Sequence, residues 1–225
     1  MREKENRIDE RHRKELLRFL LVKTAAVRQG VKAGELLRVR HCYAGINAEG
    51  LRVCLYRSDI YGILGLDYVE LKVEAESSLV LFYDSETLAA TLSERRNAMW
   101  LARMGYPVAD AQERVPPVGG SPSTATADGH LSSMLAHLVR RAGECDLPHE
   151  VGIFIGYPLK DVAGFMRNIP STPVHNGVWR VYGDAHESLV RMKEYAQIET
   201  EAREALQRAD GVEDFISMIS LKRAS

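Results

Sequence analysis

The chain has 225 residues, of which 45% are hydrophobic and 27% charged, proportions typical of a soluble globular domain with a full core. Its 30 basic and 31 acidic residues nearly cancel, so the net charge provides no field for gathering nucleic acid or an anionic membrane. The three cysteines, Cys42, Cys54 and Cys145, are an odd number at wide spacing, which favours reduced thiols in a cytoplasm over a disulfide framework. We therefore expect a single cytoplasmic domain over residues 1–225, with no nucleic-acid partner.

The first segment predicts a charged helix over residues 6–29. Acidic residues precede basic ones by four positions, as at Asp9 and Arg13, the orientation that stabilises a helix. Arg18 interrupts the longest apolar run, Leu16–Val22, which is far shorter than the roughly 20 residues of a membrane span. We expect neither a signal peptide nor membrane insertion, and the helix is a candidate surface for a homo-oligomer or a partner protein.

Strand patterns follow over residues 36–83. Val69–Ala75 alternates apolar and charged side chains, which is typical of a half-buried strand. Ser78–Tyr83 is a continuous apolar run, which indicates a deeply buried strand. Shorter candidate strands lie at residues 36–40 and 51–56.

The rest of the chain alternates helix and strand patterns. Strands are predicted at residues 150–155 and 178–182, and helices at residues 85–104, 130–142, 158–168, 185–208 and 212–221. Residues 115–129 are rich in Pro, Gly, Ser and Thr and predict a flexible internal loop, since the lysine of a phosphate-binding loop is missing. The expected fold is α/β: a mixed or partly parallel sheet with helices packed on it, built of strand-then-helix units, plus an N-terminal helix.

Three predicted strand-to-helix turns each carry a tyrosine at or next to the strand end. The carboxyl ends of parallel strands share one edge of a sheet, and helix N-termini there offer free N–H groups to an anion. We therefore expect a small, anionic ligand at this edge. The predicted contacts are Tyr83, Asp84, Gly156, Tyr157, Pro158, Tyr182, Gly183 and Asp184. The alternative interpretation is three ordinary turns without a ligand.

The reactive side chains form no catalytic or metal-binding pattern. His41 and Cys42 are adjacent, but neighbours on a strand point to opposite faces. Pro148 stands between Cys145 and His149 and prevents a regular helical metal pair. No catalytic residue and no metal site is predicted, the cofactor is unknown, and the reactivity of His41, Cys42 and Cys145 stays open.

Two long motifs stand out near the end of the chain. Leu147–Phe165 contains Pro-His-Glu, Gly-Tyr-Pro and Gly-Phe elements, and Trp179–Asp184 reads Trp-Arg-Val-Tyr-Gly-Asp. In this order they resemble the bacterial family known as domain of unknown function 3793. The resemblance implies a fold without implying an activity.

The resemblance is weaker elsewhere. Lys23–Leu37 is similar to the family's opening stretch, His-Cys-Ala-Pro-Thr followed by Ala-Gly-Ile-Lys, but lacks its His, Cys and Pro at the matching positions. Cysteines that many members carry before the tryptophan and in the last helix are also missing, with Val174, His175 and Tyr195 in those neighbourhoods. No metal site is therefore carried over from the family.

Three functions remain open at this point. The first is a protein that binds the small, anionic ligand described above. The second is an enzyme or accessory subunit that works with a redox or iron-related partner, which would give the purified protein an absorbance band. The third is a scaffold or regulatory protein that acts through its terminal helices. Four properties are not determined by the sequence: the identity of the ligand, the strand order, the oligomeric state and whether a reaction is catalysed.

Overall fold

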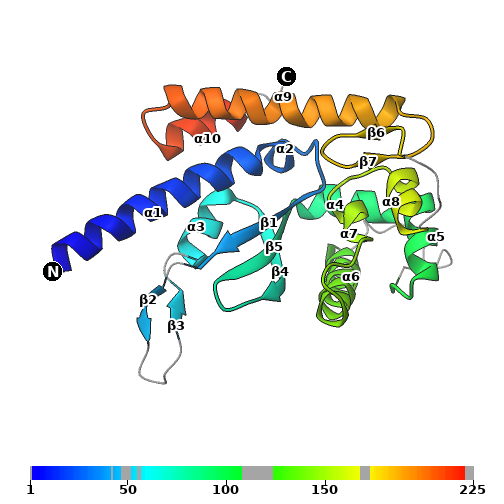
Figure 1. Cartoon of the computed structure of the whole chain (residues 1–225), viewed down its shortest axis with the longest axis horizontal. Helices are drawn as coiled ribbons and strands as arrows, with labels where there is room; N and C mark the ends of the chain where they lie inside the picture. The colour runs from blue at the N-terminus through cyan, green and yellow to red at the C-terminus, as the bar shows by residue number, and fades with distance from the viewer. Residues whose placement is uncertain are drawn as a thin grey trace. The chain divides into compact units, whose positions relative to one another are not determined.

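The computed structural model describes residues 2–41, 43–46, 52–54, 57–107, 124–167 and 173–220. The fold is mixed α/β and mostly helical, with small antiparallel sheets (Figure 1). The chain divides into two compact units, one formed by Met1–Asp84 with Arg191–Ser225 and the other by Ser85–Val190. Tyr83 and Asp84 belong to the first unit, and the other six predicted ligand contacts belong to the second.

A three-stranded antiparallel sheet with the order β1-β5-β4 lies at the centre of the first unit. The strands are β1 (Gly34–Arg40), β4 (Asp67–Val73) and β5 (Ser77–Tyr83), so the strands predicted in these regions are confirmed. β4 turns directly into β5 through a tight turn, in which the Glu74 amide donates to the Ser77 carbonyl at 2.9 Å. Such a hairpin is antiparallel by construction. The expected parallel pairing is absent among the strands of the described residues.

A separate two-stranded antiparallel sheet joins β2 (Tyr43–Ile46) and β3 (Arg52–Cys54). β3 confirms the middle of the strand predicted at residues 51–56, whose residues 51, 55 and 56 lie outside the described part of the chain. The helix α3 (Arg57–Leu64) follows and was not predicted.

Helices from both ends of the chain contribute to the core of the first unit. They are α1 (Arg2–Lys23), α2 (Ala25–Arg28), α3, the part of α9 (His186–Arg208) that follows Val190, and α10 (Val212–Ser220). Leu20 and Leu21 of α1, Phe82 of β5 and Phe215 of α10 are fully buried in one cluster. The predicted N-terminal helix is confirmed, and its last turns are a structural part of this core.

The second unit contains the helices α4 (Ser85–Ser93), α5 (Arg95–Arg103), α6 (Thr124–Glu144), α7 (Val151–Phe154) and α8 (Leu159–Met166). The single helix predicted at residues 85–104 is broken at Glu94, because its carboxylate caps α5 by accepting the amides of Arg96 and Asn97 at 3.2 and 3.1 Å. α6 begins six residues before the predicted helix start. Residues 115–123 of the predicted loop lie outside the described part of the chain.

The strand predicted at residues 150–155 is wrong, because this segment forms the helix α7. The apolar run fits either element, and Gly156 decides between them. Gly156 has φ +84°, its amide donates to Ile153, and the Tyr157 amide donates to Gly152 at 2.8 Å. This is the glycine-terminated C-cap of a helix. Gly156 therefore ends a helix here, and α8 follows.

The last predicted strand, at residues 178–182, is confirmed only at Arg180–Val181, which form one side of a short hairpin. β6 (His175–Asn176) pairs antiparallel with β7 (Arg180–Val181). The helices predicted at 158–168, 185–208 and 212–221 are confirmed as α8, α9 and α10. Tyr83 is thus the last residue of an antiparallel strand, Tyr157 follows a helix and Tyr182 follows a hairpin. The common edge of parallel strands is absent from the described residues.

Candidate functional site

A buried carboxylate, Asp161, joins the two sequence motifs in the second unit. The side chain of Asp161 is 1% exposed. Its Oδ2 accepts hydrogen bonds from Trp179 Nε1 at 2.9 Å and from Ser188 Oγ at 2.6 Å. Its Oδ1 accepts the Tyr182 amide at 2.9 Å and Lys160 Nζ at 2.8 Å. Each carboxylate oxygen therefore has two donors, its full capacity.

Electrostatics favour the charged form of Asp161. Burial by itself raises the pKa of this carboxyl, but the hydrogen bonds from Lys160, Ser188, Tyr182 and Trp179 outweigh it, and the pKa is lowered from its ordinary value. The Lys160 ammonium also donates to the Tyr182 carbonyl at 3.2 Å and to Ser188 Oγ at 2.7 Å. Asp161 and Lys160 form a charge-neutral pair that holds α8, the end of β7 and the start of α9 together.

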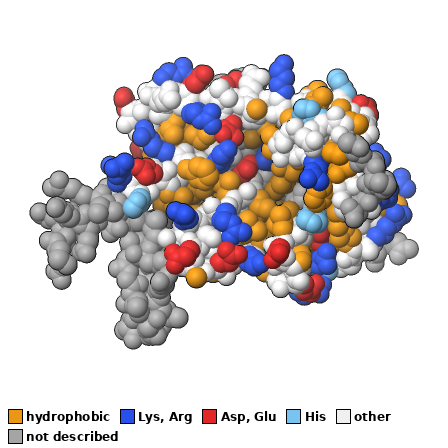
Figure 2. Space-filling model, viewed as in Figure 1, with side chains coloured by type: hydrophobic (Ala, Val, Ile, Leu, Met, Phe, Trp, Pro, Cys, Tyr) orange, Lys and Arg blue, Asp and Glu red, His pale blue; other side chains and the backbone are white. Residues whose placement is uncertain are grey.

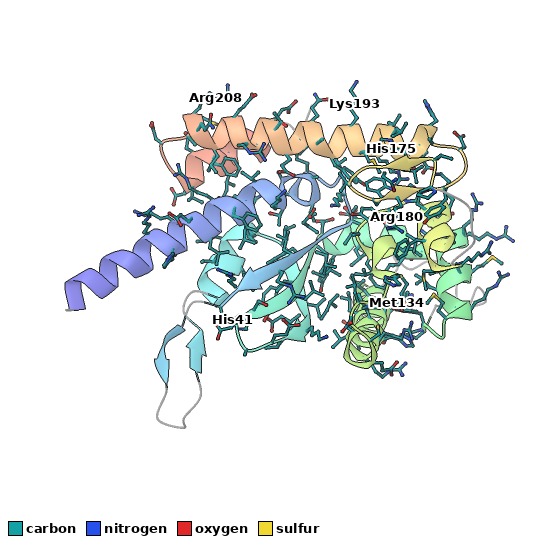
Figure 3. All side chains as sticks on the ribbon, viewed as in Figure 1. His41, Met134, His175, Arg180, Lys193 and Arg208 are labelled. Carbon is teal, nitrogen blue, oxygen red and sulfur yellow. The ribbon has the colours of Figure 1, made fainter. Side chains whose placement is uncertain are left out.

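Close packing reinforces this network. The rings of Tyr157 and Trp179 are stacked, with centroids 4.2 Å apart and an interplanar angle of 23°. A Cβ atom at Gly164 would lie 2.6 Å from Cγ of Tyr182, far inside van der Waals contact, so only glycine lets α8 approach this ring. The Arg180 guanidinium lies 5.6 Å from the centroid of the Phe165 ring (Figure 3). The two motifs are therefore two sides of one packed structure.

The six predicted contacts of the second unit surround this network. Pro158 is the N-cap of α8 and makes no side-chain capping bond. Gly183 has φ +67° and turns the chain toward α9. The Asp184 carboxylate accepts the amide of His186, the first residue of α9, at 3.0 Å. Tyr157 and Tyr182 are both half-buried.

Local sequence patterns do not group Asp161 with Lys160, Trp179 and Ser188. Asp161 and Trp179 each stood inside a motif, which was the available signal. Their mutual contact depends on the path of the chain between them, which local pattern does not show.

A second buried carboxylate, Glu150, lies at the N-cap of α7. Its side chain is fully buried, and Oε1 accepts Arg141 Nε at 2.8 Å and the Tyr106 hydroxyl at 3.2 Å. Burial raises the pKa of Tyr106, and the charge and hydrogen bond of Glu150 raise it further. Glu150 Oε2 is also buried and has no hydrogen-bond partner among the described residues. Glu150 is part of the Pro-His-Glu element, but no local pattern predicts Arg141 and Tyr106 as its partners.

The remaining reactive groups show no shared site. The Nε2 atom of His41 lies 2.7 Å from the Oγ atom of Ser78. Cys42 lies outside the described residues. The thiol of exposed Cys145 donates to the Arg141 carbonyl at 3.3 Å. Within the described ranges, no three His, Cys, Asp or Glu side chains are grouped to hold a metal ion.

Basic and acidic side chains are interspersed on the face shown in Figure 2. Of the helices in the described part of the chain, none combines the length and the apolar character needed to cross a membrane.

Comparison with known proteins identifies the family. Neither the curated proteins nor the solved structures include a match to this chain. The family model described as "Protein of unknown function (DUF3793)" matches residues 20–216. This match includes both motifs and the whole Asp161 network. The chain therefore belongs to the DUF3793 family of proteins of unknown function.

Proposed function

We propose that the protein binds a small, anionic ligand in the second unit at Gly156, Tyr157, Pro158, Tyr182, Gly183 and Asp184. Of these six residues, Gly183 and Asp184 are exposed, Tyr157 and Tyr182 are half-buried, and Gly156 and Pro158 are buried. The observation that supports this proposal is the Asp161 network, in which Asp161 accepts both the Tyr182 amide and the Trp179 indole. A fully bonded buried network fixes the segments around it, and fixed donors bind a ligand at a lower entropic cost. Tyr83 and Asp84 of the first unit stay predicted contacts.

The attraction for an anion would come from hydrogen-bond donors more than from net charge. Lys160 and Asp161 neutralise each other at 2.8 Å. The first turn of α8 has no side-chain cap, and the N–H groups of a first helical turn favour an anion. Tyr157 stacks on Trp179 and the Tyr182 ring packs against Gly164 of α8, and we infer that their hydroxyls contribute further hydrogen bonds to the ligand.

Titration calorimetry with inorganic phosphate tests the proposal. The double variant Tyr157→Phe/Tyr182→Phe keeps both rings, and therefore the stacking on Trp179, but removes both hydroxyls. We expect phosphate to bind the wild type and to bind this variant at least fivefold more weakly. Tyr68→Phe is the matched control, since Tyr68 is 42% exposed and belongs to the first unit, and it should bind like the wild type.

Two results would count against the proposal. One is a wild type that takes up no phosphate and leaves purification without a bound small molecule in native mass spectrometry. The other is equal affinity of the wild type and the double variant.

A further inference from the structure

The unpaired oxygen of Glu150 is the least satisfied polar atom of the second unit's core. Glu150 Oε2 is buried and has no hydrogen-bond partner among the described residues, whereas Oε1 has two. Leaving a buried acceptor unpaired costs about 1–3 kcal/mol, and more for a charged group. Native structures retain such an acceptor where a water or a ligand donates the missing hydrogen bond. The missing partner must be a hydrogen-bond donor.

Charge selects the kind of donor. Arg141 already neutralises Glu150 through the 2.8 Å contact of its Nε, and the Arg140 guanidinium lies 3.1 Å from His137 Nδ1. A second full cation at Oε2 would therefore be repelled by Arg141, and an anion would be repelled by Glu150 itself. An uncharged N–H or O–H donor meets neither penalty.

The aromatic side chains near Glu150 favour a planar ligand. The rings of Tyr106 and His137 are 4.2 Å apart, and the Tyr106 and Phe154 centroids are 5.7 Å apart. Burial and then the charges of Arg140 and Arg141 lower the pKa of His137, which favours the neutral ring. Neutral aromatic faces beside an acceptor suit a planar ring with a donor on its edge.

Access is provided at the outer side of the cluster. Glu150 is fully buried, but the Arg141 side chain is 32% exposed and His137 is half-buried. Both come from α6, where Met134 faces the core one turn earlier (Figure 3). A ligand would therefore reach Oε2 past the half-buried His137, while Arg141 keeps its bond to Oε1 and Met134 stays in place.

We propose that Glu150, Tyr106, Arg141 and His137 form a binding site for a planar, uncharged heterocycle that donates an N–H hydrogen bond to Glu150 Oε2. This site is separate from the one proposed for the anion. It shares none of those six residues and has its own probes.

The test is titration calorimetry with adenosine, cytidine, guanosine and uridine, whose planar bases all carry N–H donors, either in the ring or on an exocyclic amino group. Glu150→Gln retains the acceptor for Tyr106 and Arg141 but replaces Oε2 by an NH2 group, which turns the acceptor into a donor. Glu144→Gln is the matched control, because Glu144 is 52% exposed and also contacts Arg141, at 3.9 Å. We expect at least one nucleoside to bind the wild type and Glu144→Gln alike, and to bind Glu150→Gln at least tenfold more weakly.

Failure of all four nucleosides to bind the wild type would overturn the proposal and assign Oε2 to a structural water. Equal binding by Glu150→Gln would overturn it as well. If Glu150→Gln does not fold, the carboxyl 13C resonance of Glu150 in glutamate-labelled wild type decides. It should move on addition of the bound nucleoside while that of Glu144 stays, and an unmoved Glu150 resonance would contradict the proposal.

Discussion

The indole N–H of Trp179 donates a hydrogen bond to Oδ2 of Asp161 at 2.9 Å. These residues are 18 positions apart and belong to the two motifs by which the family resemblance was recognised. The contact explains why both motifs occur in the chain, since each motif supplies a hydrogen-bond partner for a buried group of the other. Asp161 needs donors because it is buried, and the Trp179 N–H needs an acceptor because its side chain is also buried.

Asp161→Asn should destabilise the second unit. An asparagine retains one acceptor oxygen but turns an NH2 group toward two of the four donors, so two buried hydrogen bonds are lost and Lys160 loses its counter-ion. We expect the free energy of unfolding to fall by about 3 kcal/mol. Both tryptophans, Trp100 and Trp179, lie in the second unit, so tryptophan fluorescence during urea unfolding reports on this unit.

Asp184→Asn is the control for that measurement. Asp184 is exposed and its carboxylate accepts the His186 amide, a role that asparagine performs equally well at a helix N-terminus. The change should stay within about 0.5 kcal/mol. A similar loss of unfolding free energy in both variants would show that the network around Asp161 contributes no more to stability than a hydrogen bond at an exposed helix end.

The stability of the second unit should fall in acid because of Asp161. Its pKa is lowered in the folded protein by the hydrogen bonds from Lys160, Ser188, Tyr182 and Trp179, against the effect of burial. A lowered pKa contributes stability that is fully present above the unfolded value of about 3.9 and is lost as the pH falls through the folded value. The difference in the free energy of unfolding between the wild type and Asp161→Asn should therefore become smaller below about pH 4. Urea unfolding at a series of pH values measures this difference, and a value that does not change with pH would contradict the lowered pKa of Asp161.

Gly164→Ala should destabilise the same unit through steric contact alone. The new Cβ would lie 2.6 Å from Cγ and 2.8 Å from Cβ of Tyr182, atoms too close to the backbone to move away cheaply. We expect a loss of about 2 kcal/mol. Gly143→Ala is the matched variant, since it lies in α6 with open space around the added carbon, and it should gain about 0.5–1 kcal/mol from helix propensity. Equal effects in thermal unfolding would rule out the packing explanation.

The sequence by itself determined the family and much of the secondary structure. The alternation in Val69–Ala75 and the apolar run Ser78–Tyr83 predicted β4 and β5, and the charge pattern predicted α1, because these signals are local. The same reasoning mistook residues 150–155 for a strand. A short apolar run fits either element, and only the backbone hydrogen bonds around the left-handed Gly156 identify it as the end of a helix.

Only the tertiary structure decided which residues of the motifs meet. Tyr157 stacks on Trp179 and the Tyr182 amide donates to Asp161, contacts made through two helices and a hairpin, whereas the sequence predicted the edge of a parallel sheet. Folding brings Asp161 into contact with Trp179 and Ser188, which are 18 and 27 positions away in the chain, and no periodicity encodes such contacts. Of the three predicted strand-to-helix turns, those at Tyr83 and Tyr182 come at the end of a strand, whereas the one at Gly156 joins two helices. Tertiary packing showed that two of them belong to one unit, held together by a single buried carboxylate.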